Sequence, residues 1–296
     1  MRIYRFTLDQ LMVSRVEPST FGAGRVFYGN ISISMSWRTQ RQLAAMLVIL
    51  VFLGIFGGVS YWRFSPEPTC FDTVKNQDEL NTDCGGVCGP CELKNPKDIV
   101  ILWTRAVPVG KTVFDVAAYV RNTNEILASP SLEYRFTLLD SEGVIAERIG
   151  RTYIYPQERT YIVEANIPVL RIPTRVEFAI IKSNWTVYRE SPPNVVVHGK
   201  EYFLEQETAS TSRSVIKAEL FNDSSFDFRT VDVHFLLFDT NENLIGVNKT
   251  ILERFLTRTA REARTVWPGV VAGTVSSVIV EPRVNVFTPT WLIQPQ

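Results

Sequence analysis

The sequence predicts a mainly β chain in which two tandem antiparallel β-sandwiches follow one transmembrane helix and a small cysteine-rich module. Three observations lead to this fold class. An uncharged stretch of 21 residues runs from Gln42 to Trp62, and four cysteines occupy the 22 positions from Cys70 to Cys91. Beyond Asp98, short segments alternate apolar and polar residues, as strands with one buried face do. No amphipathic helical pattern separates these segments, which favours antiparallel sandwiches over a parallel sheet.

The uncharged stretch, residues 42–62, is long enough to cross the roughly 30 Å hydrocarbon core of a bilayer as a single helix. Arg41 and Arg63 bound it on either side. We expect a retained membrane anchor. A cleaved signal peptide is the alternative, because Gly58-Val59-Ser60 places small residues two positions apart, as signal peptidase requires.

The orientation of the anchor follows from the residues beside it. Lys and Arg are only slightly more frequent before the span than after it, so the predicted orientation rests on the position of the cysteines. All four lie on the C-terminal side, which favours a cytoplasmic N-terminus and an extracytoplasmic C-terminal region. Residues 1–41 are then a cytoplasmic segment. Met35 begins a basic stretch followed by the apolar core, so translation from Met35 is an alternative.

The remaining chain divides by composition into four parts. They are a cysteine-rich module at 63–95, a first sandwich at 96–190, a linker at 191–199 and a second sandwich at 200–290. Pro192-Pro193 and Gly199 mark the linker.

Composition excludes some classes of function. Lysine plus arginine and aspartate plus glutamate number 31 each, so the chain lacks the basic excess of nucleic-acid-binding proteins. The chain has only two histidines, His198 and His234, so it has few of the side chains that most often serve in acid–base catalysis or metal binding. We expect no enzyme and no cofactor. His234 is expected on the exposed face of a strand.

The cysteines Cys70, Cys84, Cys88 and Cys91 predict two disulfides, because so short a segment cannot bury a core of its own. The sequence permits three pairings. Two alternatives use the cysteines differently. Cys88-Gly89-Pro90-Cys91 has the spacing of a thioredoxin-type redox site, although the surrounding strand and helix are missing. Four cysteines also suggest zinc, but their spacing is not that of a standard zinc knuckle.

The same segment contains oxygen ligands that suggest calcium. The candidates are Asp72, Asn76, Asp78, Glu79 and Asp83. An EF-hand loop started at Asp72 would need an oxygen ligand at Val74 and a glycine at Gln77, so this is not an EF-hand. The alternative is a solvated acidic loop.

Two alternating segments recur with a spacing of about 100 residues. In the first, Leu132, Tyr134, Phe136 and Leu138 share one face. In the second, Val231, Val233, Phe235 and Leu237 do so. Turn-forming residues follow each segment, at 140–143 and 239–243, and hydrophobic residues resume at once, so each segment begins a hairpin. Further strands are expected at 175–181 and 275–280.

Two resemblances accompany these patterns. Residues 70–91 resemble a cysteine-rich motif found beside membrane spans in bacterial surface proteins, and this implies an extracytoplasmic location without an activity. Phe136-Thr137-Leu138-Leu139-Asp140 and Phe235-Leu236-Leu237-Phe238-Asp239 resemble the FxLYD motif, with Leu139 and Phe238 in place of its tyrosine. FxLYD-type domains are immunoglobulin-like sandwiches of exported prokaryotic proteins, which implies this fold, a cell-envelope location and no catalytic site.

Together these observations predict a non-catalytic single-pass membrane protein that displays its sandwiches for binding or scaffolding at the cell envelope. Its expected partners are the lipid bilayer and an envelope or surface protein. The alternative is a module that recognises a glycan, peptide or metal ion, secreted after cleavage of a signal peptide. The loops at the ends of the sandwiches are the expected binding sites in that case.

Overall fold

The computed structural model describes residues 36–64, 69–208 and 211–293. The chain forms two compact units, Met1–Glu67 and Pro68–Gln296, each of which is described by itself. The start at Met35 and the expected cytoplasmic segment up to residue 35 lie outside the described residues.

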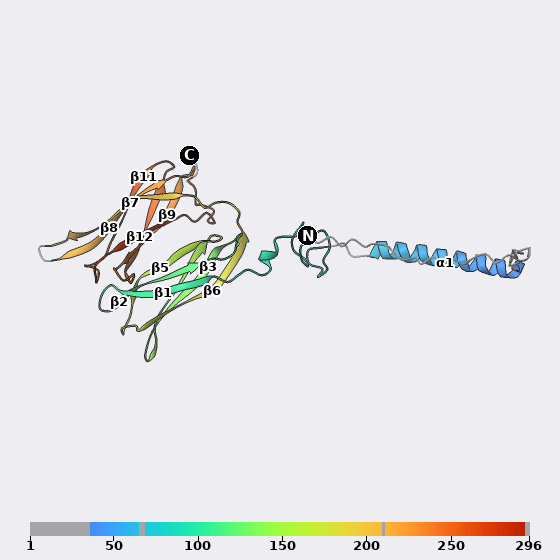
Figure 1. The fold of residues 1–296 in the computed structure, drawn as a ribbon, viewed down its shortest axis with the longest axis horizontal. Helices are drawn as coiled ribbons and strands as arrows, with labels where there is room; N and C mark the ends of the chain where they lie inside the picture. The colour runs from blue at the N-terminus through green and yellow to red at the C-terminus, as the bar shows by residue number, and fades with distance from the viewer. Residues whose placement is uncertain (1–35, 65–68, 209–210, 294–296) are drawn as a thin grey trace, which may run out of the picture. The chain divides into compact units, whose positions relative to one another are not determined.

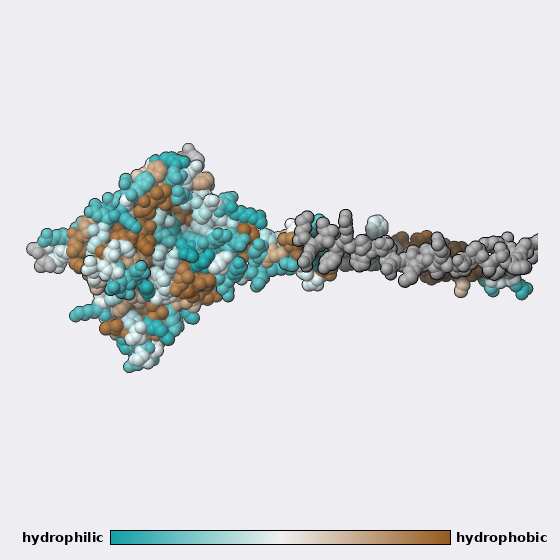
Figure 2. Space-filling view, in the orientation of Figure 1, coloured by the Kyte–Doolittle hydropathy of each residue, from teal (hydrophilic) through white to brown (hydrophobic). Residues whose placement is uncertain are grey.

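The first unit contains the helix α1, Trp37–Phe64, which includes the whole predicted span. None of its residues is buried among the described parts of the chain, and its large apolar side chains are exposed. Where the helix is visible in Figure 2, much of its surface is hydrophobic. Its 28 residues correspond to about 42 Å at 1.5 Å per residue. The helix is therefore long and apolar enough to be a membrane anchor, a property that it shares with signal sequences.

The second unit is mainly β, as predicted. Its described residues form four three-stranded antiparallel sheets, which follow a short 3₁₀ helix, η1, at Cys91–Leu93 (Figure 1). The first six strands form the sheets β1-β2-β5 and β4-β3-β6. Their bounds are Val100–Pro108 for β1, Val113–Arg121 for β2, Leu127–Asp140 for β3, Gly143–Ile154 for β4, Arg159–Pro168 for β5 and Arg175–Val187 for β6.

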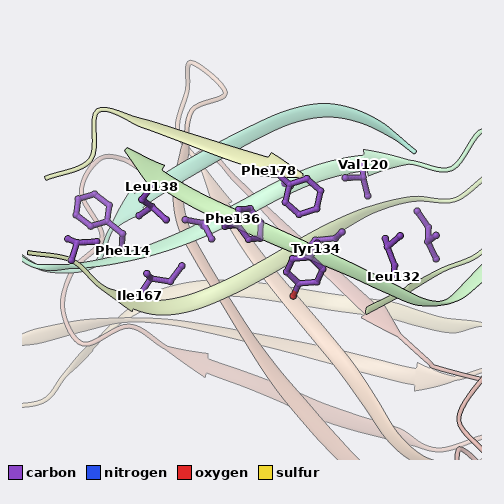
Figure 3. Packing of buried hydrophobic residues seen from close by; sticks show 13 residues of the cluster. Phe114, Val120, Leu132, Tyr134, Phe136, Leu138, Ile167 and Phe178 are labelled. Carbon is purple, nitrogen blue, oxygen red and sulfur yellow. The ribbon is translucent and has the colours of Figure 1, made fainter. Parts of the chain in front are cut away.

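These two sheets face each other and form the first sandwich. Residues of both sheets, among them Val116, Leu132, Phe136 and Phe178, meet in one hydrophobic core (Figure 3). The alternation predicted for β3 is confirmed, since Leu132, Tyr134, Phe136 and Leu138 are all at most 3% exposed.

The β3–β4 hairpin forms where the sequence predicted a turn. One carboxylate oxygen of Asp140 accepts hydrogen bonds from the backbone N–H groups of Glu142 and Gly143, at 2.8 and 3.1 Å. Gly143 has φ 127°, a conformation that glycine adopts without a steric penalty. Local turn chemistry thus sets the register Asp140↔Gly143.

The next six strands form the second sandwich, with the sheets β11-β8-β7 and β10-β9-β12. Their bounds are Val195–Gln206 for β7, Ser212–Asn222 for β8, Phe228–Phe238 for β9, Leu244–Phe255 for β10, Ala260–Val266 for β11 and Ser277–Arg283 for β12. Ile216 and Leu220 of β8 meet Phe235 and Leu237 of β9 in its core. Because β7 begins at Val195, residues 195–199 of the expected linker belong to a strand.

Candidate functional site

The four cysteines form two disulfides, Cys70–Cys88 and Cys84–Cys91. This result selects one of the three pairings that the sequence allowed. Cys88 and Cys91 are bonded to different partners, whereas a thioredoxin-type site joins the two cysteines of its motif to each other. The Cys88-Gly89-Pro90-Cys91 segment is therefore cross-linked by two structural disulfides to Cys70 and Cys84.

Two glycines allow the chain to turn tightly between the disulfides. Gly85 and Gly86 have φ values of 82° and 56°. A Cβ atom on Gly86 would lie 2.4 Å from the carbonyl oxygen of Asp78, and one on Gly85 would lie 2.7 Å from the side chain of Leu80. Only glycine fits both the conformation and the space.

Three of the five calcium candidates bind backbone N–H groups. Asp72 accepts from the N–H of Val74 at 2.8 Å and of Thr69 at 3.0 Å. These bonds, the one from Thr69 above all, hold the pKa of the Asp72 carboxyl below its usual value. Glu79, 5% exposed, accepts from the N–H of Asp83 at 2.8 Å.

Asp83 is the third of these, and the other two candidates, Asn76 and Asp78, differ in their surroundings. Asp83 accepts from the N–H of Thr73 at 2.9 Å and lies 3.3 Å from the ammonium of Lys94. Asp78 is exposed. The Oδ1 atom of Asn76 is buried without a hydrogen-bond partner among the described residues. The carboxylates thus act mainly as acceptors that order a loop with few apolar side chains.

One group in the described residues has metal-ligand atoms close together: Cys70, Glu79 and Cys88, within 4.8 Å of one another. Both sulfurs belong to the Cys70–Cys88 disulfide. Zinc binds thiolates, which a disulfide does not provide, so this group does not form the zinc site considered from the sequence.

The two sandwiches meet at a buried junction. Val107, Ala117 and Val163 on the outer face of sheet β1-β2-β5 pack against Leu236 and Val247 on the outer face of sheet β10-β9-β12. All five are at most 4% exposed. The sheets β1-β2-β5 and β10-β9-β12 are therefore covered on both faces along this contact, and the junction joins the two sandwiches by apolar packing.

An ion pair between a buried arginine and a partly buried glutamate also links the two sandwiches. Arg283 of β12 is 6% exposed and donates to Glu158, between β4 and β5, at 3.2 Å and to the carbonyl oxygen of Tyr153 at 2.9 Å. Its guanidinium also lies 4.3 Å from the centre of the Tyr153 ring. Burial raises the pKa of the Glu158 carboxyl, while the Arg283 charge opposes that rise.

The expectation that His234 is exposed is wrong: it is 8% exposed, on the outer face of β9 at the junction. Its Nδ1 lies 3.2 Å from Oε2 of Glu281 on β12. The same oxygen accepts from Thr160 and from the N–H of Tyr161 in the first sandwich, at 3.2 and 3.3 Å. Glu281 thus joins the two sandwiches, and His234 is buried because the first sandwich covers this face.

The junction opens into a cleft of about 490 Å³ between the sandwiches. It is lined by Tyr134, Thr152, Asp232, His234 and Lys249, with apolar residues beside them. The hydroxyl of Tyr134 donates to Glu164 at 2.7 Å, and burial raises the pKa of this phenol far above its usual value. A ligand in the cleft would meet both charged groups and apolar surface.

The residues of this junction were not predicted from the sequence. Leu236 and Phe238 carried a signal, because they are large apolar residues on the face of β9 that also bears Asp232 and His234. An apolar residue at such a position indicates a sheet that is covered on both faces. The partners Glu158, Glu281 and Arg283 follow only from the three-dimensional arrangement.

No family model matches this chain, and no curated protein matches it in sequence.

Proposed function

We propose that the protein is a single-pass membrane protein, N-terminus inside, that displays two immunoglobulin-like sandwiches outside the cytoplasm as a non-catalytic binding or scaffolding component of the cell envelope. The observation that carries this proposal is α1, whose apolar side chains are all exposed. Among them, Phe52, Phe56 and Trp62 are 72–83% exposed. Exposed apolar surface of this extent is stable when lipid covers it.

The disulfides support an extracytoplasmic location for the region C-terminal to the helix. Cys70 comes six residues after the end of α1 at Phe64. Disulfides such as Cys70–Cys88 persist in oxidising compartments and are rare in the reducing cytosol. An anchor followed closely by disulfides therefore supports display of the C-terminal region outside the cytoplasm.

Equivalent asparagines support a tandem repeat of one FxLYD-type domain. The Asn122 amide donates to the carbonyl oxygens of Leu127 and Tyr155, at 2.7 and 2.8 Å. The Asn222 amide donates to those of Phe226 and Phe255, at 2.8 and 3.1 Å. Each asparagine is fully buried at the end of the second strand of its sandwich. The same side chain therefore has the same structural role in both halves.

The junction supports scaffolding over catalysis. Several of its buried polar groups pair with one another: Arg283 with Glu158 between the sandwiches, His234 with Glu281 in the second, and Tyr134 with Glu164 in the first. The Arg283–Glu158 pair and the bonds from Thr160 and Tyr161 to Glu281 cross between the sandwiches. Such contacts favour a fixed arrangement of the two, which suits a platform that presents binding surfaces.

Paired reporter fusions test the proposal on the full chain. Alkaline phosphatase, which needs disulfides, and green fluorescent protein are each fused after Gln296 in a bacterial host. We expect an active phosphatase, a dark fluorescent protein, and a product that alkaline carbonate does not extract from membranes. The opposite reporter pattern would contradict the orientation, and full extraction by carbonate would contradict the anchor.

Ligand recognition is a second candidate, favoured by the cleft at Lys249 and His234. It predicts that one class among glycans, peptides and metal ions raises the melting temperature of the full chain in detergent. A Lys249→Gln variant should lose that shift. An unchanged melting temperature across the three classes would remove this candidate.

A further inference from the structure

The outer face of sheet β1-β2-β5 carries two arginines that face each other across neighbouring strands. Arg121 of β2 is directly opposite Arg159 of β5 in the antiparallel register. Both side chains are exposed, and neither has an ion-pair partner among the described residues. Like charges directly opposite each other destabilise a sheet. This arrangement therefore has a cost that the fold itself does not offset.

A row of three aromatic rings lies next to this pair. Trp103, Tyr119 and Tyr161 come from β1, β2 and β5 and are opposite one another in register. The rings of Tyr119 and Tyr161 are stacked with centroids 4.5 Å apart, and the ring of Trp103 lies 5.8 Å from each of them. All three are half-buried.

The second sandwich covers only part of this face. Ala117 and Val163, the next row beyond the aromatic rings, are at most 3% exposed in the junction. Arg121 and Arg159 lie on the other side of the aromatic row from Ala117 and Val163, and both are exposed. Along the β5 strand the second sandwich reaches further, because Glu281 accepts from Thr160 and Arg283 pairs with Glu158. The hydroxyls of Tyr119 and Tyr161 have no hydrogen-bond partner among the described residues.

We propose that Arg121, Arg159 and the two tyrosine hydroxyls bind the oxyanions of an acidic glycan. Two neighbouring guanidinium groups with free hydroxyl donors match carboxylate or phosphate oxygens, and an anion between them relieves their repulsion. The half-buried aromatic rings beside the arginines give the C–H groups of a sugar an aromatic surface to contact. This names a ligand class for the binding role proposed above, and it rests on that role.

Two observations favour a glycan over a nucleic acid. The chain has no net charge, so it lacks a basic excess, and Tyr119 and Tyr161 stack on each other, so each has at most one ring face on which a base could stack. The carboxylate of a uronic acid and the phosphodiester of a teichoic acid share the oxyanion chemistry, and the experiment separates them.

The test measures binding of the full chain in detergent to four probes: polygalacturonate, polyglycerol phosphate, neutral dextran and oligothymidine. We expect binding to one of the two acidic glycans, weakened by salt, and none to dextran. Arg159→Glu should weaken it at least about tenfold, or 1.4 kcal/mol. Arg159→Lys should retain part of it.

Arg254→Glu is the matched control, because Arg254 is exposed without an ion-pair partner among the described residues and undergoes the same change of charge. We expect it to bind as the wild type does. Because Arg159→Glu replaces a repulsive pair with an attractive one, its melting temperature should not fall, and lost binding then does not reflect misfolding.

Absence of binding to both acidic glycans, equal binding by wild type and Arg159→Glu, or tighter binding of oligothymidine would each overturn the proposal. These results are independent of the reporter fusions. Failure of the ligand class is therefore distinguishable from failure of the membrane topology.

Discussion

Asp115 is the single carboxyl group from which the clearest pH dependence is expected. It lies on β2, 2% exposed, and accepts a hydrogen bond from the N–H of Asn166 at 2.7 Å. Burial raises its pKa from 3.8 to about 6. The folded state therefore binds this proton more tightly than the unfolded state. The contribution of protonated Asp115 to the free energy of unfolding is full below pH 3.8, and it is lost as the pH rises through about 6.

Replacement of Asp115 by asparagine should remove the cost of burying an ionised carboxylate at neutral pH. The amide oxygen can still accept from Asn166, and no ionised group is buried. We expect the free energy of unfolding near neutral pH to rise by on the order of 1–3 kcal/mol, with little change near pH 4. Urea unfolding of both proteins across this pH range measures it. Parallel pH profiles would contradict the assignment.

Arg283 shows how one residue can hold the two sandwiches together. Arg283→Met should leave Glu158, whose side chain is 20% exposed, without its cation, at a cost of at most about 3–5 kcal/mol. The free energy of unfolding from urea titrations measures the loss, with Arg254→Met as the control at an exposed site. A loss no larger than in that control would show that the ion pair contributes nothing to the junction.

At the scale of single elements, local signals predicted the features that local physics determines. The inward positions of β3 and β9 followed from the alternation of residues such as Phe136 and Phe235, both fully buried. The turn at Asp140 and Gly143 followed from residue preferences. Helix α1 followed from an uncharged stretch of sufficient length.

Features that depend on distant residues were not predictable. His234 and Leu236 are buried because the other sandwich covers their face of β9, and no pattern within β9 identifies that partner. The disulfide pairing depends on how the loop folds in space. Likewise, Arg121 and Arg159 are 38 residues apart, and only the register of β2 with β5 brings them together.

Gly86 gives a test of the cysteine-rich module as an element. Gly86→Ala would place a Cβ atom 2.4 Å from the carbonyl oxygen of Asp78 at φ 56°. We expect strain of about 1–3 kcal/mol and faster cleavage of the module by protease. Gly89→Ala is the matched control, because no atom lies within 4 Å of its added Cβ. Equal cleavage rates for the two variants would contradict the tight turn.

At the scale of the whole molecule, the order of the parts along the chain determines how they act together. An exposed apolar helix precedes two disulfides, and these precede two sandwiches that share a buried junction. The junction includes both apolar packing and buried polar pairs, so we expect the sandwiches to unfold together rather than in sequence.

Cooperative unfolding is therefore a prediction for the whole molecule. A single calorimetric transition is expected for the full chain in detergent, and Arg283→Met should broaden it or split it in two. Two separate transitions in the wild-type protein would contradict coupling of the sandwiches through Arg283 and its neighbours.

Protease protection tests the central claim most directly, namely that α1 anchors the chain with residues 68–296 outside the cytoplasm. Protease is added to spheroplasts that contain the full chain with a C-terminal epitope, before and after lysis. The proposed topology predicts that the sandwich region is cleaved, or released from the membrane, in intact spheroplasts, while a cytoplasmic marker survives. A sandwich region that resists protease until lysis, and is then degraded, would contradict it.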